Sequence, residues 1–298
     1  MKTLRTPLKY FQDLPDYPFE SYYADIEVGQ MHFIDEGPKD GEPVLLLHGE
    51  PSWSYLYRHM IPPLAAAGFR CVAPDLIGFG KSDKPAKLDD HTYARHVDWM
   101  RQFIETLDLH NITFFGQDWG SLIGLRVAAE NQQRFARIVL ANGGLPTGEA
   151  ELPSMFYKWQ KFAKYSPYFP IGKIVEKGVR ARLSADIVKA YDAPFPGGKY
   201  KKATRAMPQL VPTTPDDPAA QDNREAWRVF ENWHKPFLTA FSDKDPITRG
   251  GEKVWQEKVP GAKNQKHVTI QGAGHFLQEE KGPELAQVII DFCQANPV

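Results

Sequence analysis

The sequence contains little of what a disulfide framework, a membrane span or a secretion signal requires. Only Cys71 and Cys293 are present, far apart and without metal-ligand neighbours, so we expect no disulfide framework and a reducing, cytoplasmic setting. No run of about 20 apolar residues occurs, which excludes a membrane-spanning helix. The basic segment 1–7 lacks the apolar stretch of a secretion signal.

The chain also lacks an excess of either charge. Lys and Arg total 36 against 37 Asp and Glu, so the net charge is −1. Nucleic acids and anionic membranes recruit basic surfaces, and neither is an expected partner. The nine His show no ligand spacing and no Gly-rich dinucleotide fingerprint appears, so we expect no metal and no cofactor. The sequence does not indicate an oligomeric state, and a monomer is assumed.

Apolar runs alternate with amphipathic stretches through the first half of the 298 residues. The apolar runs predict strands at 22–28, 31–36, 44–47, 69–73, 112–115 and 137–141. The amphipathic stretches predict helices at 55–67, 92–107 and 122–130. This alternation is typical of an α/β fold, in which a mostly parallel sheet carries helices on both faces.

The alternation stops after Asn142. Residues 145–230 are rich in aromatic residues and proline, and strands at 236–241 and 267–270 and a helix at 283–295 follow. We therefore predict a core domain made of 1–144 and 231–298, with 145–230 inserted as a helical cap near the carboxyl ends of the strands. Open parallel sheets bind ligands at that edge, so the cap is expected to enclose the site and exclude water.

Gly116-Gln-Asp118-Trp-Gly120 is the most informative segment of the chain. It follows a predicted strand and precedes a predicted helix, with a glycine two positions to either side of Asp118. This pattern is typical of a nucleophile elbow, a tight turn that holds one side chain up into the crevice. An isolated loop Asp more often caps the following helix. The paired glycines favour a nucleophile, here a carboxylate where serine is usual.

Two later residues complete a candidate catalytic set. His275 follows the strand at 267–270, and Asp245 follows the strand at 236–241. The order nucleophile, acid, histidine is that of α/β-hydrolase enzymes, in which the histidine is the general base and the acid orients it. Asp243 is an alternative for the acid and is otherwise interpreted as a turn residue.

The loop His48-Gly-Glu50-Pro51 follows the strand at 44–47. Such a loop can direct the backbone N–H of Glu50, together with that of Trp119, at a developing oxyanion. The Glu50 side chain has two interpretations, a solvated charge or an inward group that positions water. The loop at 74–83 is assigned a structural role.

Four segments resemble haloalkane dehalogenases: 48–58, 75–85, 117–120 and 274–279. The match is closest to the subfamily that carries Glu after the His-Gly pair, and it extends through nearly the whole chain, more loosely across the cap. The resemblance implies an α/β-hydrolase fold and the hydrolysis of small apolar halogenated substrates. The products would be alcohol, halide and a proton, formed through an alkyl ester on Asp118. It also assigns halide binding to Trp119 and Trp159, and a substrate pocket to Phe156, Pro208 and Val211.

A carboxylate nucleophile fits displacement at a saturated carbon, because it leaves an ester that water can hydrolyse. A serine would leave a stable ether, so an esterase is disfavoured. An epoxide hydrolase stays open as an alternative, since its cap tyrosines protonate the alkoxide and Tyr157, Tyr165, Tyr168 and Tyr191 are available. A catalytically silent binding protein is disfavoured because no catalytic residue is missing. A light-emitting monooxygenase is disfavoured because its relatives carry Asn after His-Gly.

Overall fold

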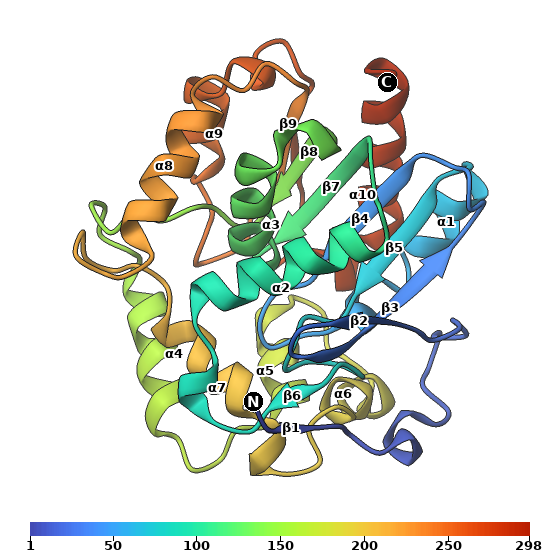
Figure 1. Ribbon diagram of the computed structural model, residues 1–298, viewed down its shortest axis with the longest axis vertical. Coiled ribbons are helices and arrows are strands. Elements are labelled where there is room, and N and C mark those ends of the chain that lie inside the picture. Colours follow the sequence, from blue (N-terminus) through green and yellow to red (C-terminus); the bar gives the residue numbers. More distant parts are fainter.

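The computed structural model describes residues 1–298 and contains a central eight-stranded sheet (Figure 1). Its strands are β2 (Tyr22–Ile26), β3 (Gly29–Glu36), β4 (Pro43–Leu47), β5 (Arg70–Pro74), β7 (Ile112–Gln117), β8 (Phe135–Ala141), β9 (Phe237–Ser242) and β10 (Val268–Ile270). Their order across the sheet is β10-β9-β8-β7-β4-β5-β3-β2. Neighbours from β10 to β5 are parallel, whereas β3 is antiparallel to both β5 and β2. A separate antiparallel pair joins β1 (Thr3–Leu4) to β6 (Lys84–Pro85).

The central strands are mostly apolar because both faces of the sheet are covered. Every residue of β7 and β9 is buried. Successive side chains of a strand point to opposite faces, so Leu45 and Leu47 join one hydrophobic cluster while Val44 and Leu46 join the other. This double burial is why the strands were recognisable as continuous apolar runs.

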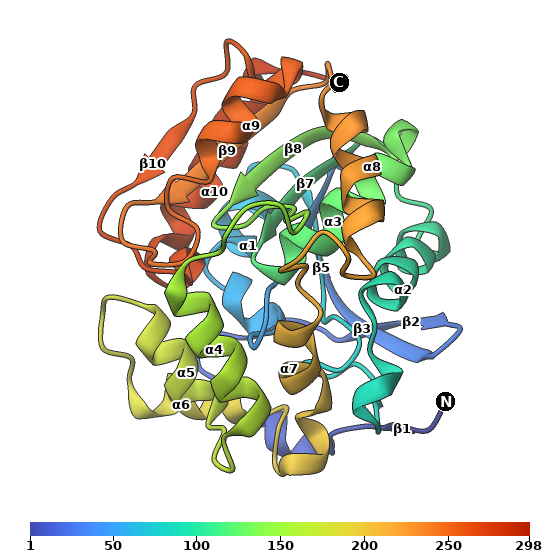
Figure 2. The same ribbon diagram turned by 90° about the vertical axis from the view of Figure 1, so that its left-hand side faces the viewer.

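Helices cover both faces of the sheet (Figures 1 and 2). The core helices are α1 (Ile61–Ala66), α2 (Tyr93–Thr106), α3 (Trp119–Glu130), α9 (Glu252–Lys258) and α10 (Leu277–Ala295). Apolar residues of α2, α3 and α9 belong to the cluster of Leu45 and Leu47, and those of α1 and α10 to the cluster of Val44 and Leu46. The mostly parallel sheet with helices on both faces is therefore confirmed.

The segment 145–230 forms five further helices, and the first four of them lie at one end of the sheet (Figure 2). They are α4 (Ser154–Tyr165), α5 (Ile171–Gly178), α6 (Ala185–Asp192), α7 (Lys202–Ala206) and α8 (Ala220–Phe230). Helix α8 lies beside α3, to which it is tied because Arg126 donates hydrogen bonds to Asp222 and Asn223. The division into core and cap domains at 145 and 230 stays a prediction.

Prolines account for two differences from the predicted helices. The single helix predicted at 55–67 is a 3-10 turn at Ser54–Tyr57 followed by α1, whose first turn contains Pro62 and Pro63. The last helix begins at Leu277 rather than at Pro283, with a non-helical residue, Lys281, two positions before that proline. The remaining 3-10 turns are Leu8–Phe11, Leu88–Asp90, Gln132–Arg134, Gly198–Tyr200, Met207–Gln209 and Pro260–Ala262. None of the helices is both long and apolar enough to cross a bilayer.

Candidate active site

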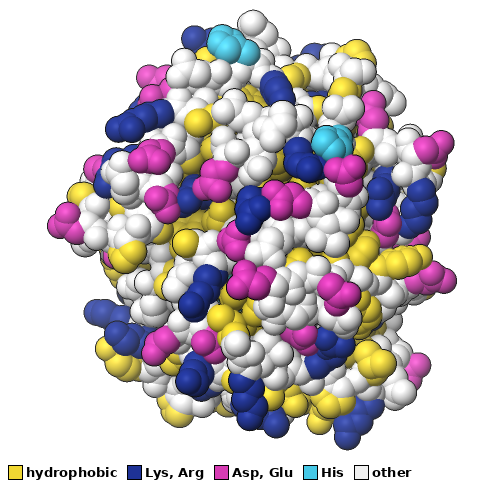
Figure 3. Space-filling model, in the orientation of Figure 1, with side chains coloured by type: hydrophobic (Ala, Val, Ile, Leu, Met, Phe, Trp, Pro, Cys, Tyr) yellow, Lys and Arg dark blue, Asp and Glu magenta, His cyan; other side chains and the backbone are white.

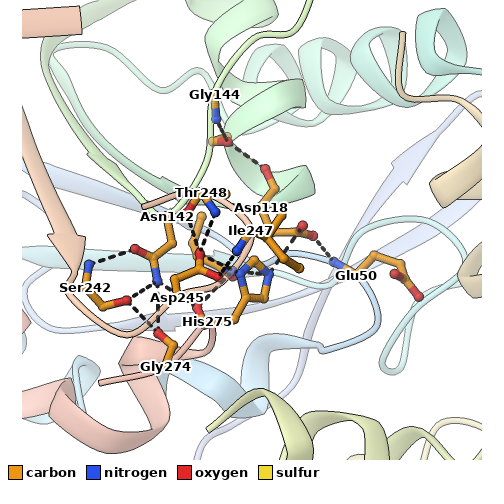
Figure 4. Close-up of polar contacts among 12 residues, drawn as sticks. Glu50, Asp118, Asn142, Gly144, Ser242, Asp245, Ile247, Thr248, Gly274 and His275 are labelled. Atoms are coloured by element: carbon orange, nitrogen blue, oxygen red, sulfur yellow. Dashed lines mark hydrogen bonds and ion pairs between the residues drawn. The ribbon is translucent and has the colours of Figure 1, made fainter. Parts of the chain in front are cut away.

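The predicted catalytic residues lie at the carboxyl ends of the parallel strands. Glu50 comes after β4, Asp118 directly follows β7, and Asp245 and His275 come after β9 and β10. Parallel strands end at one edge of the sheet, which brings these four residues together although 225 positions separate the first from the last (Figure 4).

Asp118 occupies a strained turn between β7 and α3. Its φ of 51° and ψ of −129° are unusual for a residue with a side chain. Its carbonyl accepts hydrogen bonds from the backbone N–H groups of Ser121 and Leu122. A Cβ atom at Gly120 would lie 1.9 Å from the Leu47 carbonyl oxygen, so only glycine lets the helix start this close to β4. This geometry is that of a nucleophile elbow.

His275 lies between two carboxylates. Its Nδ1 is 3.0 Å from Asp245 Oδ2, and its Nε2 is 3.5 Å from Asp118 Oδ2 (Figure 4). Asp243, the alternative acid, instead accepts a hydrogen bond from the Gly272 N–H and pairs with Lys244. Of the two candidate acids, only Asp245 contacts the imidazole.

The electrostatics of this trio favour a charged imidazole in the resting site. Burial by itself disfavours the imidazolium, but the carboxylates of Asp245 and Asp118 outweigh it and raise the pKa of His275 to about 10. Burial likewise opposes the charge of Asp245, yet His275, the Thr248 hydroxyl and the Ile247 N–H together lower the pKa of its carboxyl. The resting trio therefore holds one positive charge between two negative ones.

Glu50 contributes both its backbone and its side chain. Its N–H donates to Asp118 Oδ1 at 2.7 Å. Its side chain is buried, and Oε1 has no hydrogen-bond partner, so the interpretation as a solvated charge was wrong. Burial and the nearby Asp118 carboxylate hold the pKa of Glu50 well above its usual range, although the Trp159 indole opposes this. The N–H of Trp119 lies in the first turn of α3, where helix N–H groups lack intrahelical partners.

A cavity of about 1340 Å³ surrounds these groups. Asp118, His275 and Glu50 line it, together with all five residues that the resemblance assigned to halide and substrate: Trp119, Phe156, Trp159, Pro208 and Val211. Asp245 lies behind His275 and does not line the cavity. This volume exceeds the roughly 300–1,000 Å³ of ordinary small-molecule sites. No group of three or more His, Cys, Asp or Glu side chains is arranged to hold a metal ion.

Two polar residues that sequence reasoning missed hold the histidine loop. The Asn142 amide donates to the carbonyl oxygens of Gly274 and His275, both at 3.0 Å, and accepts from the Ser242 N–H (Figure 4). The Gln117 amide donates to the His275 carbonyl oxygen at 3.3 Å. The available signals were a polar residue directly after β8 and the position of Gln117 inside the elbow motif. Neither signal identifies the histidine loop as the segment that these amides contact, because Gly274 and His275 lie more than 130 positions later in the sequence.

Comparison with known proteins places this geometry in a family. The α/β hydrolase fold family matches residues 42–282, which confirms the predicted fold. A haloalkane dehalogenase of Psychrobacter cryohalolentis is 52% identical over 100% of both chains, and one of Mycolicibacterium paratuberculosis is 51% identical over 99% of both. A cis-3-alkyl-4-alkyloxetan-2-one decarboxylase of Xanthomonas campestris is 31% identical, covering 95% of this chain and 99% of the relative.

A solved structure agrees with the sequence relatives. The tetrameric haloalkane dehalogenase DpaA from Paraglaciecola agarilytica superposes with a TM-score of 0.90 at 37% identity, covering 97% of each chain. The likeness therefore extends over core and cap alike. The sequence similarity to these enzymes extends over the full length of the chain, and Asp118 at the elbow faces His275. The chain therefore belongs to the haloalkane dehalogenase family of the α/β-hydrolase superfamily.

Proposed function

We propose that this protein is a haloalkane dehalogenase, which converts a haloalkane and water into an alcohol, a halide ion and a proton. The observation that carries the proposal is the carboxylate at the elbow. Asp118 lines the large cavity, and its Oδ2 lies 3.5 Å from Nε2 of His275, while Asp245 contacts Nδ1 on the other side of the same imidazole. A carboxylate in this position favours an ester intermediate, which the same histidine can help to hydrolyse.

The first step is displacement at the carbon that bears the halogen. An Asp118 oxygen forms a bond to that carbon as the carbon–halogen bond breaks, and the halide leaves with the bonding electrons. Trp119 and Trp159 both line the cavity. Their indole N–H groups are donors without a competing acceptor, which suits them to binding the departing halide. Neutral donors stabilise that charge without strong retention of the product.

The second step is hydrolysis of the ester. Alkylation removes the negative charge of Asp118, one of the two carboxylates that keep the pKa of His275 near 10. The imidazole then loses its proton more readily and becomes able to accept one from water. The hydroxide oxygen bonds to the ester carbonyl, whose oxyanion faces the N–H groups of Glu50 and Trp119. Collapse breaks the bond between that carbonyl carbon and the alkoxy oxygen. The departing oxygen takes the remaining proton of the attacking water, so the alcohol leaves and Asp118 returns to its carboxylate form.

The Glu50 carboxyl is the further polar group at this step. It is buried, and burial together with the nearby Asp118 charge raises its pKa well above the usual range, which favours the neutral carboxyl. A neutral carboxyl both donates and accepts hydrogen bonds, so it can hold a water molecule without repelling the Asp118 carboxylate. We therefore assign Glu50 a water-positioning role.

The epoxide hydrolase alternative loses support from the positions of the cap tyrosines. No tyrosine lines the cavity. Tyr165 and Tyr168 are exposed, and Tyr191 is buried and donates to Glu279. A silent binding protein is disfavoured because Asp118, His275 and Asp245 are all present and in contact.

The proposal also includes a cellular compartment and the number of chains that the reaction needs. A reducing cytoplasm suits Cys71 and Cys293, which are buried and unpaired. Every group assigned to the reaction comes from one chain, so the reaction needs no second copy.

The test is halide release from 1-bromobutane and 1,2-dibromoethane, with diol formation from styrene oxide measured in parallel. We expect halide without diol, and no halide from Asp118→Asn when mass spectrometry verifies that the Asn has not deamidated. Diol without halide would establish the epoxide hydrolase instead. Neither product would favour the silent site.

A further inference from the structure

The cavity that holds the catalytic residues has a strongly basic lining. Eight Lys and Arg residues line it against four Asp and Glu, and two of those four are Glu50 and Asp118 of the catalytic site. The chain as a whole is balanced, with 36 basic and 37 acidic residues. The face in Figure 3 likewise intersperses both signs of charge. The asymmetry is therefore local to the cavity.

Most of these cations have no ionic partner. Arg224 pairs with Glu149, Lys258 with Glu231 and Lys244 with Asp243. The other five form no salt bridge and are exposed at the cavity wall; we call them the cationic rim: Lys158, Lys177, Arg180, Arg228 and Arg249. They come from α4, the end of α5 and the residues just after it, α8 and the β9–α9 loop, which are separate segments of the fold (Figure 2).

Exposed apolar side chains accompany the cationic rim. Met155, Phe162 and Val254 line the same cavity and are 46%, 39% and 36% exposed. Leu122, Phe156 and Val211 also line the cavity and are buried, so its apolar lining continues inward from the exposed side chains. A ligand that matches this arrangement has an apolar chain along the wall and a negative charge at the opening.

We propose that the preferred substrates are haloalkanes that carry an anionic group, such as a carboxylate, at the end of the chain remote from the halogen. The halogenated carbon meets Asp118 and the carboxylate lies among the cationic rim. This rests on the proposed dehalogenase function and adds the substrate class. The chemistry is unchanged: an ω-bromoalkanoate and water give an ω-hydroxyalkanoate, bromide and a proton.

Chain length is the first test. We expect kcat/KM for ω-bromoalkanoates, relative to 1-bromoalkanes of equal length, to rise from three to twelve carbons. A short chain such as 3-bromopropanoate places its carboxylate in the apolar wall beside Asp118, where burial and like charge oppose it. The longer chain of 8-bromooctanoate is expected to hold the carboxylate away from Asp118, towards solvent and the rim. Salt screens the attraction between the carboxylate and the cationic rim. Sodium sulfate, which adds no halide, should therefore lower kcat/KM for 8-bromooctanoate more than for 1-bromooctane.

Matched charge reversals are the second test. Lys158→Glu changes the rim, whereas Lys161→Glu changes an exposed residue of the same helix that does not line the cavity. Arg180→Glu and Arg182→Glu form an equivalent pair. We expect each rim reversal to lower kcat/KM for 8-bromooctanoate by about three- to tenfold through weaker electrostatic attraction. The control reversals, and all four variants with 1-bromooctane, should stay within about twofold of the unmodified protein.

The outcomes separate this proposal from the function on which it rests. Turnover of 1-bromooctane with no preference for the carboxylate at any length would overturn the substrate class and leave the dehalogenase intact. Equal effects of rim and control reversals would also overturn it. Absence of turnover with every bromide would overturn the dehalogenase. In that case, the binding of decanoate and of decanol can be compared by tryptophan fluorescence. Tighter binding of decanoate would still support the anion site, and equal binding would refute it.

Discussion

Asp118→Asn is expected to lower the pKa of His275, because it removes a negative charge 3.5 Å from Nε2. At that separation a pair of unit charges attracts by about 1.2 kcal/mol in bulk water and by about 5 kcal/mol at an effective dielectric constant of about 20. Each pKa unit corresponds to about 1.4 kcal/mol. The pKa of about 10 should therefore fall to between about 6.5 and 9. The alkylated enzyme loses the same charge, so this variant mimics the state in which His275 must act as a base.

The assay is NMR titration of the imidazole nitrogens, with His275 assigned by comparison with His275→Gln. Asp243→Asn is the matched control, since that carboxylate faces Gly272 and Lys244 and should leave His275 unchanged. A raised native pKa stabilises the fold below the unfolded value of 6.5, and that stabilisation is lost as the pH rises through about 10. The free energy of unfolding should thus fall over that range, less steeply in Asp118→Asn. If the pKa of His275 is the same in Asp118→Asn as in the unmodified protein, the proposal that loss of the Asp118 charge lowers this pKa is refuted.

Three other substitutions probe the site and its support. Trp159→Phe should weaken bromide binding by about ten- to a hundredfold through loss of one hydrogen bond to an anion; unchanged affinity in a fluorescence titration would remove Trp159 from the halide site. Gly49→Ala should reduce kcat at least about a hundredfold because a Cβ there would lie 2.4 Å from Asp118 Oδ1, while Gly197→Ala, with no atom within 4 Å, should not. Asp75→Asn should cost about 3 kcal/mol in urea unfolding because the buried Asp75 carboxylate is bonded to His32, Ser54 and Lys81; a loss below about 1 kcal/mol would contradict this.

Sequence reasoning succeeded where local pattern determines structure. The doubly buried strands are continuous apolar runs, and the glycines around Asp118 are required by contacts within a few ångströms of the turn. It failed where proline redirected the backbone, at 55–67 and before Pro283. At 55–67 the predicted helix spans the pair Pro62-Pro63, which lacks the N–H groups that helix continuation needs. The sequence predicts a last helix that starts at Pro283, whereas the chain is already helical from Leu277.

The parts of the site that escaped prediction depend on contacts distant in sequence. Asn142 is an ordinary polar residue until the fold brings Gly274 and His275 against its amide. The inward direction of the Glu50 side chain follows from packing beneath the cap, which the motif does not encode. The cationic rim was likewise invisible, because its residues lie on four separate segments within a chain of balanced charge.

The central claim is that Asp118 becomes alkylated and that His275 is needed only to remove the alkyl group. The most direct measurement is intact mass spectrometry of His275→Gln after brief exposure to 1-bromobutane, followed by peptide mapping. The account predicts one butyl group per chain, bound to Asp118, together with one equivalent of bromide and no further turnover. An unmodified chain, or a butyl group on any other residue, would contradict it.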